Sequence, residues 1–169
     1  MATRRQGREW ALQMLFQSDL NPGLDLEAAI PKFWRQQWTC QMEEDADKDQ
    51  EGESEAAKAK SVEDRVAPPK IRLFTETLAR GVLEHLPEID ARLKEHTLNW
   101  PMHRMGSVER NVLRLAYYEL MFCPDVPPAV VLNEAIDLAK YFSNADAGRF
   151  VNGVLDKLNK ELHGPKPAK

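Results

Sequence analysis

The sequence holds few of the residue types on which most enzymes and metal proteins depend. It has two cysteines, Cys40 and Cys123, and four scattered histidines, so it offers neither a disulfide framework nor histidines at the spacing of metal ligands. The signatures Gly-x-Gly-x-x-Gly, Gly-x-Ser-x-Gly, His-Glu-x-x-His and the phosphate-binding loop are all missing. We therefore expect a protein that is not an enzyme and that binds no metal and no cofactor.

Long apolar runs are also missing. No run approaches the roughly 20 residues that span a membrane, and the first residues, Met1 to Arg5, lead straight into an amphipathic pattern without the apolar core of a signal peptide. Arg4 and Arg5 are typical of transit peptides, but Glu9 and Asp19 argue against one. We expect the protein to be cytoplasmic.

The acidic residues are concentrated in one segment. The chain has a net charge of −4, yet residues 40–66 alone contain ten acidic and four basic side chains. The rest of the chain holds 19 basic and 17 acidic groups, a net charge of +2. Because residues 40–66 have almost nothing to bury, they cannot offset the entropy lost on ordering. We expect a disordered loop or a solvated helical extension there, with an acidic mimic of nucleic acid as the alternative.

Apolar residues at helical spacing are abundant in the rest of the chain. In residues 107–122 they cover so much of the circumference that this segment is predicted to be a central helix packed on several sides. Ser107 is expected to cap its first turn, and Glu109 places a carboxylate near the positive end of the helix dipole. The prolines of Asp125–Pro128 then stop the helix.

The same pattern predicts about seven helices and no strand, which is an all-α fold. Short linkers favour antiparallel packing of neighbouring helices. Ser143-Asn144 is expected to cap the last helix. The predicted helices cover residues 4–20, 25–38, 70–86, a short stretch after Pro87, 107–122, a stretch from Pro127 to Phe142, and a last one that follows Asn144 and reaches Leu162.

Three arginines, Arg4, Arg5 and Arg8, gather at the start of the first predicted helix. Mobile cations and the backbone N–H groups of a helix start both attract phosphate. This cluster is therefore a candidate site for nucleic acid, and a solvated helix end without a ligand is the alternative interpretation.

Arg149 and Phe150 form a second candidate site. An exposed aromatic ring beside an arginine can stack on an unpaired base while the cation holds its phosphate. Phe150 equally fits the apolar face of the last predicted helix, so core packing remains the other interpretation. Gly148 and Gly153 cost that helix about 1 kcal/mol each relative to alanine, which close approach of another helix or of a ligand would explain.

Four segments carry a resemblance to a known family: RRQGREWALQMLF at 4–16, VERNVLRLAYYEL at 108–120, DVPPAVVLNEAIDLAKYF at 125–142 and RFVNGVLDKL at 149–158. Taken together they resemble the bacterial NusB family of transcription antitermination factors. The resemblance implies two three-helix subdomains, packed orthogonally and sharing a long central helix. The implied domains are residues 1–86, with 40–66 as an insert, and residues 87–163, followed by a basic tail at 164–169.

The resemblance implies a non-catalytic RNA-binding adaptor. Such a protein binds the single-stranded boxA element of nascent RNA, notably on ribosomal RNA operons, jointly with the small-subunit ribosomal protein NusE. It helps RNA polymerase in the transcription elongation complex to resist termination. By position, the implied RNA-binding residues are Arg4, Arg5, Arg8, Asp146, Arg149 and Phe150, and the implied NusE-binding residues are Phe16 and Glu109.

Two other functions stay open from the sequence. A protein-only or self-associating helical adaptor, including a homodimer that covers the arginines, would have lost its RNA contact. A similar helical module also precedes the catalytic domain of certain ribosomal-RNA cytosine methyltransferases, so a remnant of such an RNA-binding module is the other alternative, although the sequence has no cofactor loop.

Overall fold

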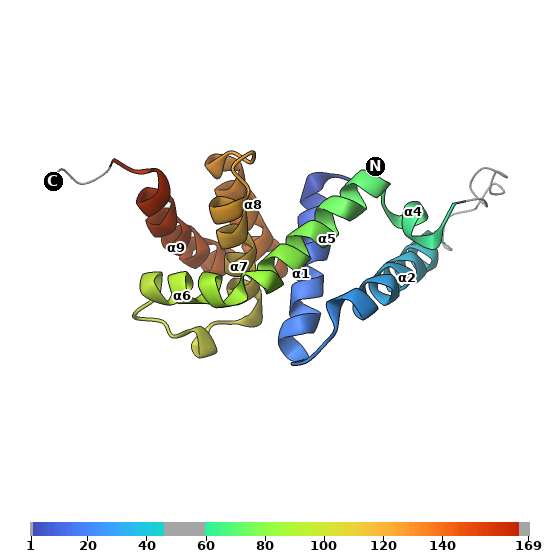
Figure 1. Ribbon diagram of the computed structural model, residues 1–169, viewed down its shortest axis with the longest axis horizontal. Coiled ribbons are helices and arrows are strands. Elements are labelled where there is room, and N and C mark those ends of the chain that lie inside the picture. Colours follow the sequence, from blue (N-terminus) through green and yellow to red (C-terminus); the bar gives the residue numbers. More distant parts are fainter. Residues whose placement is uncertain (1, 46–59, 166–169) are drawn as a thin grey trace. The chain divides into compact units, whose positions relative to one another are not determined.

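The computed structural model describes residues 2–45 and 60–165, which form eight α-helices and one 3₁₀ turn and contain no strand (Figure 1). The predicted all-α class is confirmed. None of these helices is long and apolar enough to cross a membrane. The chain divides into two compact units, Met1–Thr77 and Leu78–Lys169. The predicted domain boundary after residue 86 stays a prediction.

The first unit is built from α1 (Arg4–Leu20), α2 (Leu26–Asp45), the short α4 (Val62–Val66) and the beginning of α5 (Pro69–Glu84) (Figure 1). The Thr3 side chain caps α1 by accepting a hydrogen bond from Gln6 N. Trp34 packs edge-on against Trp10, with 5.3 Å between ring centroids, and its Nε1 donates to Glu76 Oε1 at 2.8 Å. A buried aromatic core therefore joins α1, α2 and α5.

The second helix extends beyond its predicted end at residue 38. α2 runs through Pro31 and continues to Asp45, so the first part of the predicted acidic segment is helical. α4 packs against α2, where the Arg65 guanidinium lies over the Trp38 ring at 5.2 Å. Of the two structures expected for this segment, a disordered loop or a helical extension, residues 40–45 adopt the helix, and the contact with α4 supports it. The end of the acidic segment, residues 60–66, contains α4, and Val66 is buried there. Residues 46–59 of this segment and most of the predicted basic tail lie outside the described residues.

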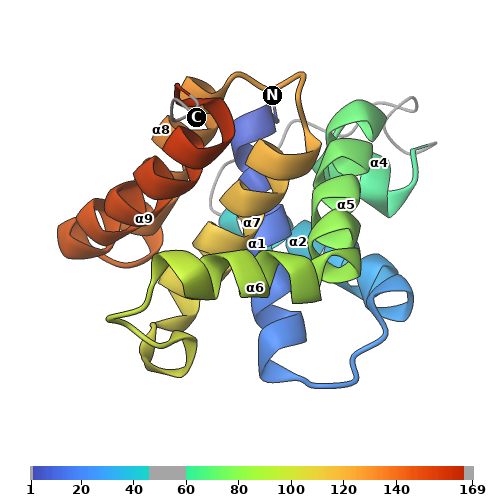
Figure 2. The ribbon, with the colours of Figure 1, turned by 60° about the vertical axis from the view of Figure 1, so that its left-hand side comes forward.

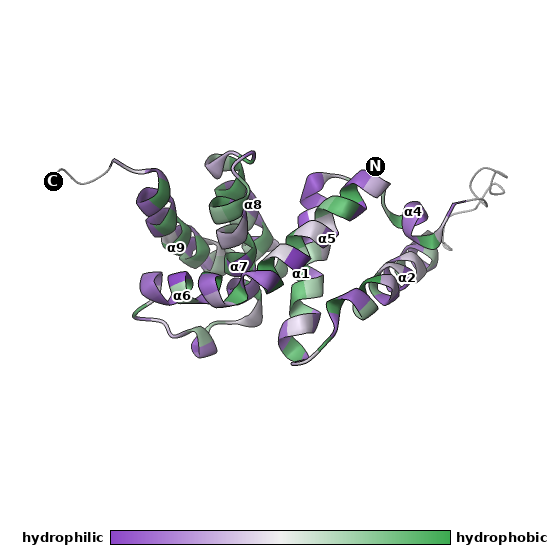
Figure 3. Cartoon of the chain, in the orientation of Figure 1, coloured by the Kyte–Doolittle hydropathy of each residue, from purple (hydrophilic) through white to green (hydrophobic). Residues whose placement is uncertain are grey.

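The second unit contains the end of α5, then α6 (Leu86–His96), the 3₁₀ turn η1 (Met102–Arg104), α7 (Ser107–Phe122), α8 (Pro128–Phe142) and α9 (Ala145–His163) (Figure 2). α7 packs against α6, α8 and α9, and its residues Leu113 and Tyr117 are fully buried. The predicted central helix is therefore central within this unit. Hydrophobic and hydrophilic residues share the same helices (Figure 3), as the amphipathic pattern predicted.

Two helix starts in this unit show how far the capping predictions hold. Asn144 caps α9 by accepting a hydrogen bond from Ala147 N at 2.9 Å, as predicted. The prediction for Ser107 is wrong, because Ser107 lies inside α7 and Gly106 occupies the N-cap without a side-chain hydrogen bond. A Cβ on Gly106 would lie 2.1 Å from Glu109 Oε2. The glycine therefore lets the Glu109 carboxylate fold back over the helix start.

Candidate functional site

The start of α1 holds the three clustered arginines. Arg4 is exposed, and Arg5 is partly exposed with its Nε 3.6 Å from Glu9 Oε1, one turn along the helix. Arg8 is not the mobile cation that the sequence predicted, because only 3% of its surface is exposed. The guanidinium carbons of Arg4 and Arg8 each lie 5.4 Å from the centroid of the Phe74 ring on α5. Two cations therefore share one aromatic ring.

Phe74 completes this group, which we call the α1 cluster (Arg4, Arg5, Arg8 and Phe74). Phe74 lies within the predicted helix 70–86, and its side chain is partly exposed. A Cβ on Gly7 would lie 2.9 Å from Phe74 Cδ1, so the glycine permits the close approach of the ring to α1. This contact joins residues far apart in the chain, and no local pattern signals it.

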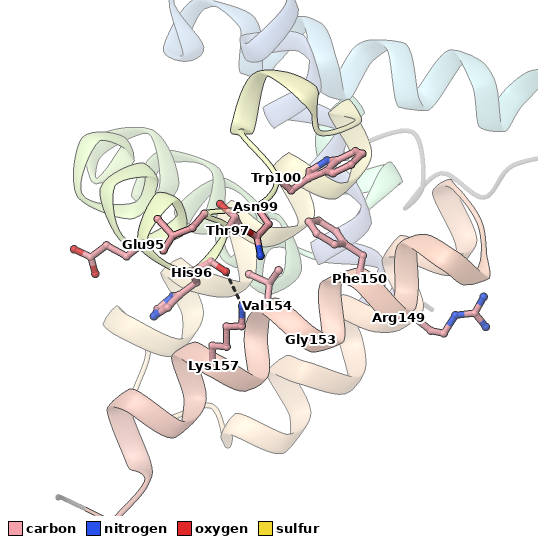
Figure 4. A pocket seen from close by; sticks show the side chains of 11 residues that line it. Glu95, His96, Thr97, Asn99, Trp100, Arg149, Phe150, Gly153, Val154 and Lys157 are labelled. Carbon is pink, nitrogen blue, oxygen red and sulfur yellow. Dashed lines mark hydrogen bonds between the residues drawn. The ribbon is translucent and has the colours of Figure 1, made fainter.

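The first turns of α9 carry the second predicted group. Asp146 and Arg149 form an ion pair in which 82% and 74% of the side chains are exposed. Phe150 is partly exposed, so its ring is neither wholly in the core nor wholly in solvent. The ring points toward Trp100, whereas Arg149 points away from it (Figure 4). Because successive helical residues diverge by about 100°, the arginine and the ring project from α9 in different directions.

Two hollows adjoin the Phe150 ring, and Trp100 lines both of them. The larger one has a volume of about 410 Å³ and is drawn in Figure 4; we call it the Trp100–Phe150 hollow. The smaller one has a volume of about 350 Å³. Both volumes lie in the range of small-ligand sites. The larger hollow is lined by residues that include Asn99, Trp100, Phe150, Gly153 and Lys157, and the smaller one by residues that include Trp100, Glu109, Asn144, Asp146 and Phe150.

The segment from His96 to Trp100 forms one wall of the larger hollow, and hydrogen bonds hold it in place. Thr97 is buried, and its Oγ1 donates to Leu93 O at 2.7 Å. Trp100 N donates to Thr97 O at 2.9 Å. From the opposite wall, Lys157 Nζ donates to His96 O at 3.1 Å (Figure 4). The backbone that carries Trp100 is therefore tied to both α6 and α9.

His96 joins α6 to α7 and α9 just before this wall. Its Nδ1 lies 2.9 Å from Tyr117 Oη, and its Nε2 lies 2.7 Å from Glu161 Oε2. Burial, followed by the nearby charge of Glu161, raises the pKa of Tyr117, so this hydroxyl stays protonated. The hydrogen bond with His96 lowers the pKa of Glu161. The network fixes the end of α6 and thereby the loop that follows it.

The sequence prediction missed Asn99, Trp100 and Lys157 as site residues. Asn99 and Trp100 lie between two predicted helices, the short one after Pro87 and the one over 107–122. In α9 a usable signal exists, because Phe150, Gly153 and Lys157 have the spacing of residues on one helix face. That Trp100 lies opposite this face is decided only by the fold.

The NusB family model matches residues 5–160. The chain belongs to the NusB family. It is 37% identical over 163 residues to the transcription antitermination protein NusB of Desulfatibacillum aliphaticivorans, and the alignment covers 96% of this chain and 93% of that protein. Of the solved structures, T. maritima NusB gives a TM-score of 0.71 at 32% identity and covers 98% of this chain and 95% of that chain. A crystal structure of antitermination factors NusB and NusE in complex with dsRNA gives a TM-score of 0.65 at 26% identity, and the match covers 94% of this chain and 96% of that chain.

The two positions that the NusB resemblance assigned to the protein partner lie in different units. Phe16 is partly exposed on α1. Glu109 is partly exposed on α7, and its Oε1 accepts a hydrogen bond from Ser143 Oγ at 3.1 Å. Glu109 also lines the smaller hollow together with Asp146 and Phe150, which the resemblance assigned to RNA. That these positions form one surface with the α1 cluster stays a prediction.

Proposed function

We propose that this chain is a transcription antitermination factor that acts without catalysis, as an RNA-binding adaptor. It binds a single-stranded boxA-type element of nascent RNA together with NusE and helps RNA polymerase resist termination, notably on ribosomal RNA operons. Membership in the NusB family supports this function, as does the likeness to a NusB solved with NusE and dsRNA. The observation that carries the proposal is the partly exposed Phe150 ring, which lines two hollows on α9.

The α1 cluster supplies contacts to the RNA backbone. Arg4 and Arg5 bring cations to a helix start, where the helix dipole also favours an anion. Arg8 stays packed against Phe74 and acts by holding that ring in place. Because phosphate contacts carry no sequence information, the α1 cluster sets the affinity for RNA and its salt dependence.

The second unit supplies the sequence preference. Phe150 stacks on an unpaired base, and the Asp146 carboxylate accepts hydrogen bonds from a base edge. Arg149 contacts a phosphate from its exposed position. An unpaired strand suits this arrangement because its base edges are accessible, whereas an RNA helix hides them in a deep and narrow major groove.

NusE binds through Phe16 and Glu109. Phe16 offers a partly exposed ring, and Glu109 offers a carboxylate that Ser143 orients. Since Glu109 and Phe150 line the same hollow, NusE docked on Glu109 adjoins the RNA held at Phe150. Binding of either partner therefore favours binding of the other.

Fluorescence anisotropy with a short labelled boxA-type RNA tests this function. The unpaired RNA, a scrambled sequence and a duplex of the same sequence are each titrated with the protein, with and without NusE, at about 50 to 200 mM salt. We expect the unpaired boxA-type RNA to bind most tightly, NusE to increase its affinity, and the logarithm of the binding constant to fall linearly with the logarithm of salt.

Two results would contradict the proposal. Equal affinity for the scrambled RNA would remove boxA recognition and leave a non-specific binder. No RNA binding, with or without NusE, would favour the protein-only or self-associating adaptor, and sedimentation of the protein alone would then show whether it forms dimers.

A further inference from the structure

Lys157, rather than Arg149, is the cation that shares a face of α9 with Phe150. Phe150, Gly153 and Lys157 are three and four residues apart, which is the spacing that places side chains above one another on a helix. All three line the Trp100–Phe150 hollow. Arg149 also lines it, but the guanidinium end of that side chain points away from the hollow (Figure 4). The hydrogen bond from Lys157 Nζ to the carbonyl oxygen of the opposite wall holds the ammonium group beside the hollow.

We propose that the Trp100–Phe150 hollow takes one unpaired nucleotide, with its base against the two rings and its phosphate at Lys157. This inference rests on the proposed RNA-binding function and gives it a nucleotide position with its own residues. The hollow, at about 410 Å³, lies in the size range of small-ligand sites. Trp100 exposes 49% of its surface, so its indole is accessible without any unfolding.

The lining of the hollow favours a nucleotide over an apolar side chain of a protein partner. Aromatic rings stack on any base, the Asn99 amide has both a donor and an acceptor for a base edge, and the Lys157 ammonium attracts a phosphate. An apolar side chain would contact the rings and the aliphatic lining residues but would leave the Asn99 amide and the Lys157 ammonium unused. The acidic lining residue Glu95 points away from the hollow in Figure 4.

Gly153 offers a way to fill the hollow without disturbing the helix packing. An ideal Cβ at this position meets no atom within 4 Å, so the space above it is open. Leucine favours a helix more than glycine does, so Gly153→Leu adds bulk to the hollow while α9 loses no stability. Gly153→Ala gives nearly the same gain in helix propensity with little added volume and is the matched control.

The first test compares these two variants in the titration with unpaired boxA-type RNA. We expect Gly153→Leu to bind about tenfold or more weakly, which corresponds to the loss of one stacked base. Gly153→Ala should stay within about twofold of the unmodified protein. Thermal unfolding followed by circular dichroism checks that neither variant is less stable. Trp100→Ala should weaken binding as Gly153→Leu does, whereas Tyr141→Ala, which removes a ring that is 72% exposed on α8, should not.

The second test isolates the charge of Lys157. Lys157→Gln should reduce the slope of log K against log salt by about 0.7, the value for one phosphate contact on a single strand. Lys160→Gln makes the same charge change on the same helix, at a side chain that pairs with Asp156 and does not line the hollow. This control should leave the slope unchanged.

The outcomes separate this site from the proposed function. If Gly153→Leu binds RNA as tightly as Gly153→Ala, or if Lys157→Gln and Lys160→Gln change the slope equally, the nucleotide site is wrong while RNA binding stands. If the unmodified protein binds no RNA, both proposals fail. If Gly153→Leu weakens binding of NusE in the absence of RNA, the hollow belongs to the protein partner and the nucleotide site is again wrong.

Discussion

Arg5 and Arg8 lie on the same helix, yet replacing them with alanine should have different effects. Arg5 exposes 41% of its side chain and pairs with Glu9 at 3.6 Å. Arg8 exposes only 3% of its surface, and its guanidinium carbon lies 5.4 Å from the centroid of the Phe74 ring. The same change in charge is therefore made once at a solvated position and once at a buried one.

The expected loss of folding stability follows from these environments. Arg5→Ala removes an exposed i,i+4 ion pair, worth about 0.3–0.5 kcal/mol. Arg8→Ala removes a desolvated cation–π contact, worth about 2 kcal/mol, and the packing of a buried aliphatic stem, worth about 0.8 kcal/mol per CH₂. With two CH₂ groups lost, we expect a total loss of about 3.5 kcal/mol at Arg8, measured by urea unfolding.

The salt dependence of RNA binding should respond in the opposite order, with a larger change for Arg5→Ala than for Arg8→Ala. Arg5→Ala should reduce the slope of log K against log salt by about 0.7, because one phosphate contact to a single strand is lost. Arg8→Ala should leave the slope unchanged under conditions in which the variant is folded. Phe74→Leu is the control, since it removes the aromatic partner of Arg8 without changing the charge. If Arg8→Ala lowered the slope as much as Arg5→Ala and left the unfolding free energy unchanged, Arg8 would be a direct RNA contact and its assignment as a buried packing residue would be refuted.

Two further predictions concern the second unit. Arg114→Ala should lower the free energy of unfolding by about 3 kcal/mol. Arg114 Nε and Nη2 donate to the two carboxylate oxygens of Asp90, each at 2.9 Å, and Asp90 would lose both hydrogen bonds. Full stability in Arg114→Lys would contradict the importance of this two-bond geometry. The hydrogen bond with His96 lowers the pKa of folded Glu161 below its ordinary value of 4.5. The resulting stabilisation is complete above the ordinary pKa and is lost as pH falls through the lowered pKa. The free energy of unfolding, measured at about pH 6 and pH 3, should therefore fall less for Glu161→Gln than for the unmodified protein. An equal fall in both proteins would contradict the stabilising role of the bond between Glu161 and His96.

The helices of this protein could be predicted because their determinants are local. The apolar spacing over residues 107–122, the prolines that follow it and the cap at Asn144 each act within one or two helical turns. The all-α class and the order of the longer helices follow from such signals. Composition left residues 40–45 open between a disordered loop and a helical extension, and packing against α4 supports the helix.

The candidate site was only partly predictable. The resemblance pointed to Asp146 and Phe150, and the structure adds that both line a hollow with Glu109. Trp100 could not be found from the sequence, because it precedes Phe150 by a loop and two helices and reaches it only when the loop after α6 packs beside α9.

Local sequence signals settle which segments become helices and which faces of them are apolar. Packing between helices is needed to bury Arg8, since Gly7 allows Phe74 to approach α1. It is also needed to form the hollow next to Phe150, beside which the Lys157 ammonium is held while the Arg149 guanidinium points away. The physical reason is that helix hydrogen bonds join residues four apart. Burial, cation–π contacts and hollows instead join side chains that are distant in the chain, and periodicity along the sequence carries no information about those partners.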